Sequence, residues 1–305
     1  MDSTEKKLSK HKVAVIGAGT MGNGITHVFA QYGFPVTMID ISKEAVDKGL
    51  NTIHQNMDRM VLKEKITSAE RDTAVTLIQT ATDIRSGIKD ATLIIEAATE
   101  NIDLKLKIFR DINQYSHKEA ILATNTSSIS ITKIASVTDR PQQVIGMHFM
   151  NPVPVMKLVE IIRGYSTSDE VAREVTNISE SLEKIPVVVN DYPGFVANRV
   201  LMPMINEAII ALWEGVAGVD EIDNVMKLGM AHPMGPLQLA DFIGLDVVLA
   251  ILRVLQEGYG QPKYTPCPLL VNMVQAGKKG VKSGEGFYTY TPGSREMKVS
   301  ESFKQ

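Results

Sequence analysis

A stretch near the start of the chain, residues 13–24, constrains the fold more than any other part of the sequence. Four apolar, strand-forming residues run directly into the pattern Gly-x-Gly-x-x-Gly, with its glycines at Gly17, Gly19 and Gly22. A helical spacing of apolar residues follows. We expect Gly17 to form the turn after the strand, Gly19 to let the backbone approach a pyrophosphate, and Gly22 to let the helix pack closely. The run therefore predicts a strand–turn–helix unit that binds a dinucleotide.

An acidic residue lies where such a unit needs one. A second apolar run, residues 36–39, ends at Asp40, which is 21 residues after Gly19. A carboxylate at this place can accept hydrogen bonds from both hydroxyls of an adenine ribose, and its charge opposes the 2′-phosphate of NADP. Ile41 and Ser42 follow, so neither residue is an arginine that could receive that phosphate. The sequence therefore predicts that this unit binds NAD. The alternative for the glycine pattern is an ordinary glycine-rich turn between a strand and a helix.

The composition fits a globular enzyme with one large or two medium domains. The 305 residues are 44% hydrophobic and 22% charged, with a net charge of −3, so nothing points to nucleic acid or an anionic membrane as a partner. The sequence contains no run of about 18 uncharged apolar residues, the length that a membrane-spanning helix needs. The polar residues 1–12 do not resemble a secretory signal. Cys267 is the single cysteine, which fits a reducing compartment. We expect a cytoplasmic protein, with an organelle matrix as the alternative, and no metal site because the histidines show no ligand spacing.

The pattern of apolar residues divides the chain into two parts. In the first part, strand-like runs alternate with helical stretches, which predicts right-handed crossovers and a mostly parallel sheet. The second part is helical, with loops rich in Gly and Pro. We predict an α/β, Rossmann-type domain over residues 1–190, with helices on both faces of its sheet and an inserted helical hairpin at about 43–79. A smaller all-helical domain is expected over residues 191–305.

A dinucleotide domain joined to a second domain suggests a hydride-transfer enzyme, which needs a base to take the hydroxyl proton of its substrate. His148 directly follows the predicted strand of residues 144–147. Because the carboxyl ends of strands in open α/β sheets line the crevice where ligands bind, we expect His148 to face the nicotinamide side. From position alone, a structural histidine is the alternative.

The segment that begins at His148 carries a family resemblance. The run His-Phe-Met-Asn-Pro-Val-Pro-Val-Met-Lys-Leu-Val-Glu, from His148 to Glu160, closely resembles the signature of the L-3-hydroxyacyl-CoA dehydrogenase family, which includes bacterial 3-hydroxybutyryl-CoA dehydrogenases. The resemblance covers almost the whole chain. The other matching segments are residues 17–22, 125–128, 191–199, 233–236 and 284–288. Several specific motifs in the same order make a chance similarity very improbable.

The resemblance implies roles for four residues. It makes His148 the general base and Glu160 the carboxylate that fixes the imidazole tautomer and stabilises the imidazolium. A solvated carboxylate at a strand end is the alternative for Glu160. The resemblance makes Ser127 and Asn198 the residues that hydrogen-bond the substrate oxygens. Their alternatives are a helix N-cap for Ser127 and an interdomain hydrogen bond for Asn198.

The resemblance also places side chains near the nicotinamide half of the cofactor. These are Glu100, Lys105 and Asn125, although Glu100 and Lys105 could equally be surface charges around a helix start. The helical hairpin corresponds to a family feature near the coenzyme A moiety. The expected cofactor-binding residues are Gly17, Gly19, Thr20, Met21, Gly22, Asp40, Glu100, Lys105 and Asn125.

The expected activity is reversible, NAD-dependent oxidation of a short- or medium-chain (3S)-3-hydroxyacyl-CoA to the 3-ketoacyl-CoA, as in fatty acid or butanoate metabolism. We further expect a homodimer through the C-terminal domain, because its helices carry apolar residues over much of their circumference. Two alternatives are a 3-hydroxyacid dehydrogenase that uses a lysine, and a non-catalytic dinucleotide-binding protein. The run from His148 to Glu160 disfavours the first. The set Ser127, His148, Glu160 and Asn198 disfavours the second.

Overall fold

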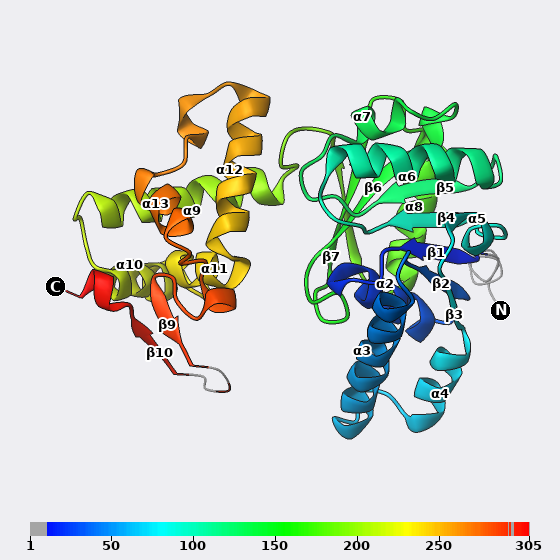
Figure 1. Cartoon of the computed structure of the whole chain (residues 1–305), viewed down its shortest axis with the longest axis horizontal. Coiled ribbons are helices and arrows are strands. Elements are labelled where there is room, and N and C mark those ends of the chain that lie inside the picture. Colours follow the sequence, from blue (N-terminus) through cyan, green and yellow to red (C-terminus); the bar gives the residue numbers. More distant parts are fainter. Residues whose placement is uncertain (1–10, 292, 294–295, 305) are drawn as a thin grey trace. The chain divides into compact units, whose positions relative to one another are not determined.

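The computed structural model describes residues 11–291, 293 and 296–304. Most of the polar N-terminal segment of residues 1–12 therefore lies outside the described residues. The chain forms two compact units, Met1–Tyr192 and Pro193–Gln305, and each has its own core (Figure 1). No helix of the described residues combines the length and the apolar character that crossing a bilayer requires.

The first unit is built on one eight-stranded sheet with the strand order β3-β2-β1-β4-β5-β6-β7-β8. Neighbouring strands are parallel except β6 and β7, which are antiparallel because the eight residues between them are too few for a crossover. The predicted mostly parallel, Rossmann-type sheet is confirmed. The strands are β1 (Val13–Ile16), β2 (Val36–Ile39), β3 (Ile78–Ala81), β4 (Leu93–Glu96), β5 (Ile121–Thr124), β6 (Val144–Phe149), β7 (Leu158–Arg163) and β8 (Ile185–Asn190).

Helices cover both faces of this sheet, as alternation of side chains along the strands requires. Val13 and Val15 of β1 share a core with α2 and α8, whereas the intervening Ala14 is buried outside that cluster. The hairpin consists of α3 and α4. The helices of the unit are α2 (Thr20–Gln31), α3 (Lys43–Leu62), α4 (Ser68–Thr76), α5 (Ile84–Gly87), α6 (Ile102–Tyr115), α7 (Ile131–Ala135) and α8 (Asp169–Ser181), with a 3₁₀ turn η1 (Pro141–Gln143).

Two elements of this unit were not expected from the sequence. Strand β3 lies at one edge of the sheet, and its sequence Ile-Gln-Thr-Ala is half exposed, so it lacks the apolar run that marks the other strands. Helix α5 has a single turn and ends before any apolar periodicity can develop. Neither segment has the apolar pattern that would predict it from the sequence.

The opposite edge of the sheet is strand β8. The N–H groups of Ile185 and Asp191 donate to the carbonyls of Lys157 and Arg163, so residues with odd numbers face β7. Pro186 therefore lies at a position whose backbone faces away from the sheet. The strand is apolar yet exposed, with Ile185 61% and Val188 50% accessible.

The second unit is helical, with one addition to the expected architecture. A two-stranded antiparallel sheet, β9 (Tyr288–Tyr290) with β10 (Met297–Val299), packs against the helical core. The helices are α9 (Ala197–Trp213), α10 (Val219–Asn224), α11 (Pro236–Ile243), α12 (Leu245–Tyr259) and α13 (Pro268–Gln275), with a π turn η2 (Val225–Gly229) and 3₁₀ turns η3 (Pro262–Tyr264), η4 (Val281–Ser283) and η5 (Glu301–Phe303).

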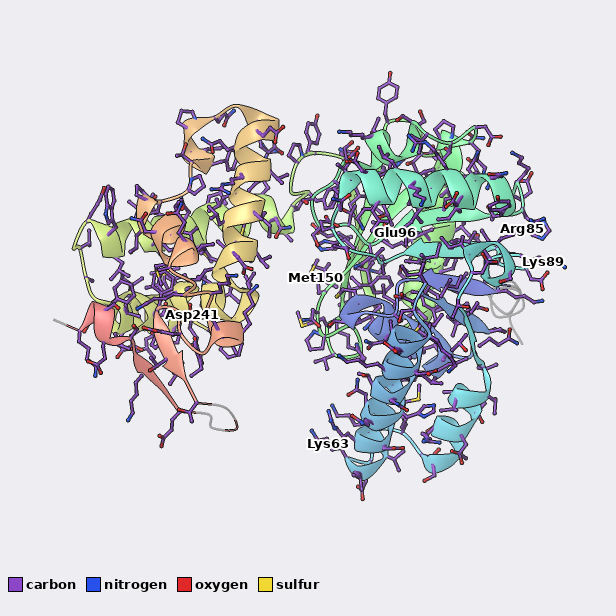
Figure 2. The ribbon with its side chains drawn as sticks, in the orientation of Figure 1. Lys63, Arg85, Lys89, Glu96, Met150 and Asp241 are labelled. Carbon is purple, nitrogen blue, oxygen red and sulfur yellow. The ribbon has the colours of Figure 1, made fainter. Side chains whose placement is uncertain are left out.

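Buried carboxylates tie β9 to the helices of this unit. Asp241, labelled in Figure 2, belongs to α11 and is 1% exposed. It accepts hydrogen bonds from the N–H groups of Phe287 (3.1 Å) and Tyr288 (2.9 Å) and from the Tyr290 hydroxyl (3.0 Å). Burial raises the pKa of the Asp241 carboxyl to about 6, against the opposing effect of these hydrogen bonds. A Cβ at Gly286 would lie 1.8 Å from an Asp241 oxygen, so only glycine fits there.

Candidate active site

The glycine turn has the geometry that its sequence predicts. Gly17 has a φ of +106°, a backbone conformation that residues with a Cβ rarely adopt, and α2 begins three residues later. A Cβ at Gly22 would lie 1.8 Å from the Gly17 carbonyl oxygen, which explains the close packing of the helix start. A Cβ at Gly19 would meet nothing within 4 Å, so the protein itself leaves the space over this residue open. The turn therefore fits a pyrophosphate at the start of α2.

Asp40 is held beside this turn. Its Oδ2 accepts a hydrogen bond from the Ala18 N–H (2.9 Å), and its Oδ1 accepts one from the Ser42 N–H (3.3 Å). A cavity of about 470 Å³ lies next to the turn and is lined by Gly19, Thr20 and Asp40, among others. Met21 instead packs against the core of the unit. The carboxylate is thus fixed at the edge of the space where an adenosine would bind.

His148 is fixed between two side chains. It is the fifth residue of β6 and lies directly opposite Glu160 in the antiparallel pair with β7. Its Nδ1 is 2.8 Å from Glu160 Oε2, and its Nε2 is 3.0 Å from Ser127 Oγ. His148 is 7% and Glu160 2% exposed, so the Glu160 carboxylate is not a solvated charge. A histidine oriented by a carboxylate in this way is the recurring arrangement of a general base.

Ser127 belongs to the loop of residues 125–130 between β5 and α7, which we call the Ser127 loop. Ser130, not Ser127, is the N-cap of α7, so the N-cap alternative for Ser127 is wrong. Asn125 fixes the start of the loop, because its Oδ1 accepts a hydrogen bond from the Phe149 N–H (2.9 Å). At the other end Asp191 accepts hydrogen bonds from the Ser130 hydroxyl (2.8 Å) and the N–H groups of residues 131 and 132.

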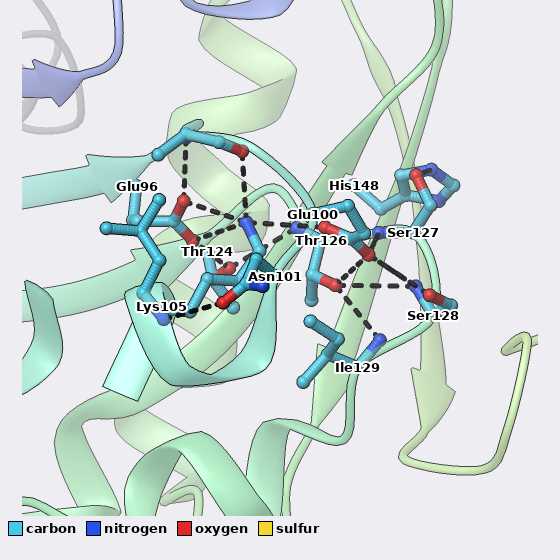
Figure 3. A network of polar contacts seen from close by, with 12 residues as sticks. Glu96, Glu100, Asn101, Lys105, Thr124, Thr126, Ser127, Ser128, Ile129 and His148 are labelled. Atoms are coloured by element: carbon cyan, nitrogen blue, oxygen red, sulfur yellow. Dashed lines mark hydrogen bonds and ion pairs between the residues drawn. The ribbon is translucent and has the colours of Figure 1, made fainter. Parts of the chain in front are cut away.

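Glu100 holds the middle of the Ser127 loop (Figure 3). Its Oε1 accepts hydrogen bonds from the Thr126 hydroxyl (2.5 Å) and from the N–H groups of Ser127 (3.0 Å) and Ser128 (3.2 Å). Its Oε2 is 3.3 Å from the ammonium of Lys105. Neither Glu100 nor Lys105 is therefore an isolated surface charge.

Lys105 is paired with Glu96, a residue that sequence reasoning missed. The Lys105 Nζ lies 2.8 Å and 2.9 Å from the two carboxylate oxygens of Glu96, and both side chains are almost completely buried. Glu96 ends the apolar strand β4 next to the glycine turn of β1. The sequence does contain a signal for Glu96: an acidic residue at the end of an apolar strand, at the edge of the sheet where the cofactor is expected.

Lys184 was missed as well. Its ammonium donates hydrogen bonds to the carbonyls of Val153 (2.6 Å) and Met156 (2.8 Å), in the loop that connects β6 to β7 after His148. Burial lowers the pKa of Lys184 from its ordinary value, and the positive charge of Lys157 lowers it further. Lys184 thus fixes the loop that separates His148 from Glu160 in the sequence.

Asn198 lies in the other unit, in the first turn of α9, where its N–H donates to the Gly194 carbonyl. The structure therefore brings Ser127, His148 and Glu160 together in the first unit, with Glu100, Lys105 and Asn125 around the same loop.

The comparison with known families decides which class of enzyme this site belongs to. Residues 12–192 match the model described as "3-hydroxyacyl-CoA dehydrogenase, NAD binding domain", and residues 194–290 match "3-hydroxyacyl-CoA dehydrogenase, C-terminal domain". The chain belongs to the 3-hydroxyacyl-CoA dehydrogenase family. The resemblance inferred from the motifs is confirmed, and the enzyme is an NAD-dependent dehydrogenase. Its glycine turn and Asp40 fit that cofactor.

Individual relatives of this dehydrogenase agree. A protein of Deinococcus radiodurans named "Probable 3-hydroxybutyryl-CoA dehydrogenase" is 54% identical over 279 residues, which are 92% of this chain and 100% of the relative. The "3-hydroxybutyryl-CoA dehydrogenase" of Bradyrhizobium diazoefficiens is 50% identical over 92% of this chain and 95% of its own. The crystal structure of (S)-3-hydroxybutyryl-CoA dehydrogenase from Ralstonia eutropha has a TM-score of 0.90 at 50% identity and covers 93% of this chain and 100% of that one.

Proposed function

We propose that this dehydrogenase oxidises the 3-hydroxyl of short-chain (3S)-3-hydroxyacyl-CoA esters, above all 3-hydroxybutyryl-CoA, and also reduces the corresponding 3-ketoacyl-CoA. The observation that carries the proposal is the position of His148 between Glu160 and Ser127. The names of the relatives with about half of their residues identical support the four-carbon acyl group.

In the proposed mechanism His148 is the general base. With Nδ1–H donating to Glu160, the lone pair lies on Nε2, on the side of Ser127. Nε2 takes the proton of the substrate 3-hydroxyl, and the negative charge of Glu160 stabilises the imidazolium that results. In the reverse direction the same nitrogen returns the proton to the carbonyl oxygen at C3. NAD, when bound, supplies the acceptor for the hydride that leaves C3.

Ser127 and Asn198 are proposed to bind the substrate. The Ser127 hydroxyl, which lies 3.0 Å from His148 Nε2, is within reach of an oxygen that binds at the base. The Asn198 amide is proposed to donate or accept a second hydrogen bond with a substrate oxygen, which would help to hold C3 in place. Around the cofactor, Asp40 and the glycine turn would bind the adenosine and pyrophosphate. Glu100 follows β4 and Asn125 follows β5, and the ammonium of Lys105, from α6, reaches the end of β4. The nicotinamide half is expected at this edge of the sheet, beyond the switch point between β1 and β4.

The second unit is proposed to form a homodimer. It exposes several large apolar side chains, among them Trp213 (56%), Leu228 (85%) and Phe242 (54%). A second copy of the chain would cover such a surface. A reducing compartment, the cytoplasm or an organelle matrix, is the expected location, since the single cysteine, Cys267, is buried and unpaired.

A spectrophotometric assay tests the proposed function directly. Purified enzyme, NADH and acetoacetyl-CoA are mixed, and the loss of NADH absorbance is followed, with longer 3-ketoacyl-CoA esters in parallel. We expect rapid oxidation of NADH and the highest kcat/KM with the four-carbon ester. Free acetoacetate is the control and should react far more slowly. A folded enzyme that consumes no NADH with any ester would overturn the proposal.

A further inference from the structure

The pair of Glu96 and Lys105 forms a buried charged centre behind the Ser127 loop. Glu96 is 0% and Lys105 1% exposed, and the ammonium lies between both oxygens of the carboxylate. Glu96 also accepts hydrogen bonds from the Ala98 N–H (2.7 Å) and the Thr124 hydroxyl (2.7 Å). Every oxygen of this carboxylate therefore has protein partners, and its position is fixed from three sides.

Glu100 connects this centre to the reacting groups. One of its oxygens faces Lys105 at 3.3 Å, and the other binds the backbone of the Ser127 loop. Ser127 in turn places its hydroxyl 3.0 Å from His148 Nε2. A continuous series of polar contacts thus runs from Glu96 through Lys105, Glu100 and Ser127 to His148. Figure 3 labels all five residues. Glu96 itself is fully buried, so it cannot contact the substrate.

We propose that Glu96 is a positioning residue for the dehydrogenation. It balances the charge of Lys105 in the interior, so that Glu100 stays on the Ser127 loop and keeps Ser127 at His148. This inference rests on the proposed function, because it assigns Glu96 a part in the reaction at His148.

The physical reason is competition for Glu100. Without the Glu96 charge, the buried ammonium of Lys105 would have Glu100 as its remaining anionic partner among the contacts described. A buried cation without a full counter-charge is costly, so it draws in the nearest mobile carboxylate. The Glu100 side chain is 41% exposed, so it has space to move toward Lys105, whereas Lys105 is enclosed. A shift toward Lys105 withdraws Oε1 from the N–H groups of Ser127 and Ser128, and the middle of the loop loses its anchor.

The test compares two Glu-to-Gln variants of the full-length enzyme, assayed at saturating NAD. Glu96→Gln keeps the size and the acceptor oxygen but removes the charge. Glu174→Gln, on α8, makes the same change at a carboxylate that pairs with His11 (2.8 Å) and takes no part in the contacts of the Ser127 loop described above. We expect Glu96→Gln to lower kcat by about 10- to 100-fold, as small displacements of reacting groups do. The KM for the acyl-CoA should change less, and Glu174→Gln should behave as wild type.

A double-mutant cycle separates positioning from a general loss of stability. In a Ser127→Ala background the hydroxyl that Glu96 positions is gone, so Glu96→Gln should lower kcat only a few-fold further. The inference is overturned if folded Glu96→Gln has a normal kcat, or if its full loss persists in the Ser127→Ala background. Wild-type enzyme inactive toward every ester would instead overturn the proposed function.

If Glu96→Gln does not fold, Glu100→Gln takes its place in the same cycle. Its side chain is partly exposed, so its replacement puts the fold at less risk. The proposed effect of Glu96 passes through this carboxylate. A normal kcat in folded Glu100→Gln therefore overturns the inference, and a loss of kcat that disappears in the Ser127→Ala background supports it.

Discussion

His148 and Glu160 face each other across an antiparallel strand pair, with Nδ1 and Oε2 2.8 Å apart. Twelve residues separate them in the sequence, yet the turn between β6 and β7 makes them direct neighbours. Both are buried, so the charge of Glu160 acts on the imidazole with little screening by solvent.

The first prediction concerns this pair. Glu160→Gln should fold but lose on the order of tens to thousands in kcat, because part of the general-base assistance, typically worth about 10²–10⁴, is lost. KM should change less. Steady-state kinetics measure both parameters, and a normal kcat in the folded variant would refute the pairing.

The second prediction concerns cofactor choice. The wild-type enzyme should have a much higher kcat/KM with NAD than with NADP, because the Asp40 carboxylate opposes a 2′-phosphate. Asp40→Asn should reduce this preference by raising activity with NADP. Equal wild-type values for the two cofactors would show that Asp40 does not face the ribose.

The third prediction uses two glycines of the same turn. Gly22→Ala forces a Cβ to within 1.8 Å of the Gly17 oxygen, so the turn must shift, at a cost of about 1–3 kcal/mol or more. Gly19→Ala has open space and an ordinary φ of −66°. It should keep the wild-type melting temperature but raise the KM for NAD, since the methyl group occupies the pyrophosphate site. A Gly19→Ala enzyme with unchanged KM for NAD would place the cofactor elsewhere.

The fourth prediction concerns pH and the second unit. Asp241 has a folded pKa of about 6 against an ordinary 3.8, so its contribution to stability is complete below about pH 4 and is lost as the pH rises through 6. The loss is on the order of 3 kcal/mol. Asp241→Asn does not titrate, so the stability difference between wild type and variant should shrink as the pH rises from 4 to 6.

Urea unfolding followed by tryptophan fluorescence is the suitable measurement. Trp213 on α9 is the only tryptophan, so the signal reports the second unit. A difference that stays constant across this pH range would mean that Asp241 titrates normally in the folded protein.

The fifth prediction concerns assembly. Light scattering at micromolar concentration should give the mass of a dimer, and Leu228→Asp should shift it toward the monomer, because Leu228 is 85% exposed within one chain. Lys118→Asp, at an exposed position of the first unit, is the control and should leave the mass unchanged. A monomeric wild-type protein would rule the dimer out.

The sequence predicts the parts of this molecule whose signal is local. The glycine turn and the alternation of strands and helices depend on nearby residues, and they predicted the Rossmann-type fold that is observed. Strand β3 was missed because an edge strand needs no apolar run, and β9 was missed as a strand because three residues carry no period.

The candidate site divides in the same way. His148 and Glu160 were predicted because one continuous motif contains both residues. The pairing of Glu96 with Lys105 was not, because it depends on how α6 packs behind β4, and neither residue type indicates burial. Lysine and glutamate side chains are usually solvated.

Pro186 has a consequence beyond the single molecule. An exposed strand of valine and isoleucine at the end of a sheet could recruit a strand from another molecule and begin aggregation. Pro186 occupies the first outward-facing backbone position of β8 and has no N–H group. A strand that added to this edge could therefore not form a hydrogen bond to that position. The apolar border of this sheet is thereby a poorer template for the edge-to-edge addition of another strand.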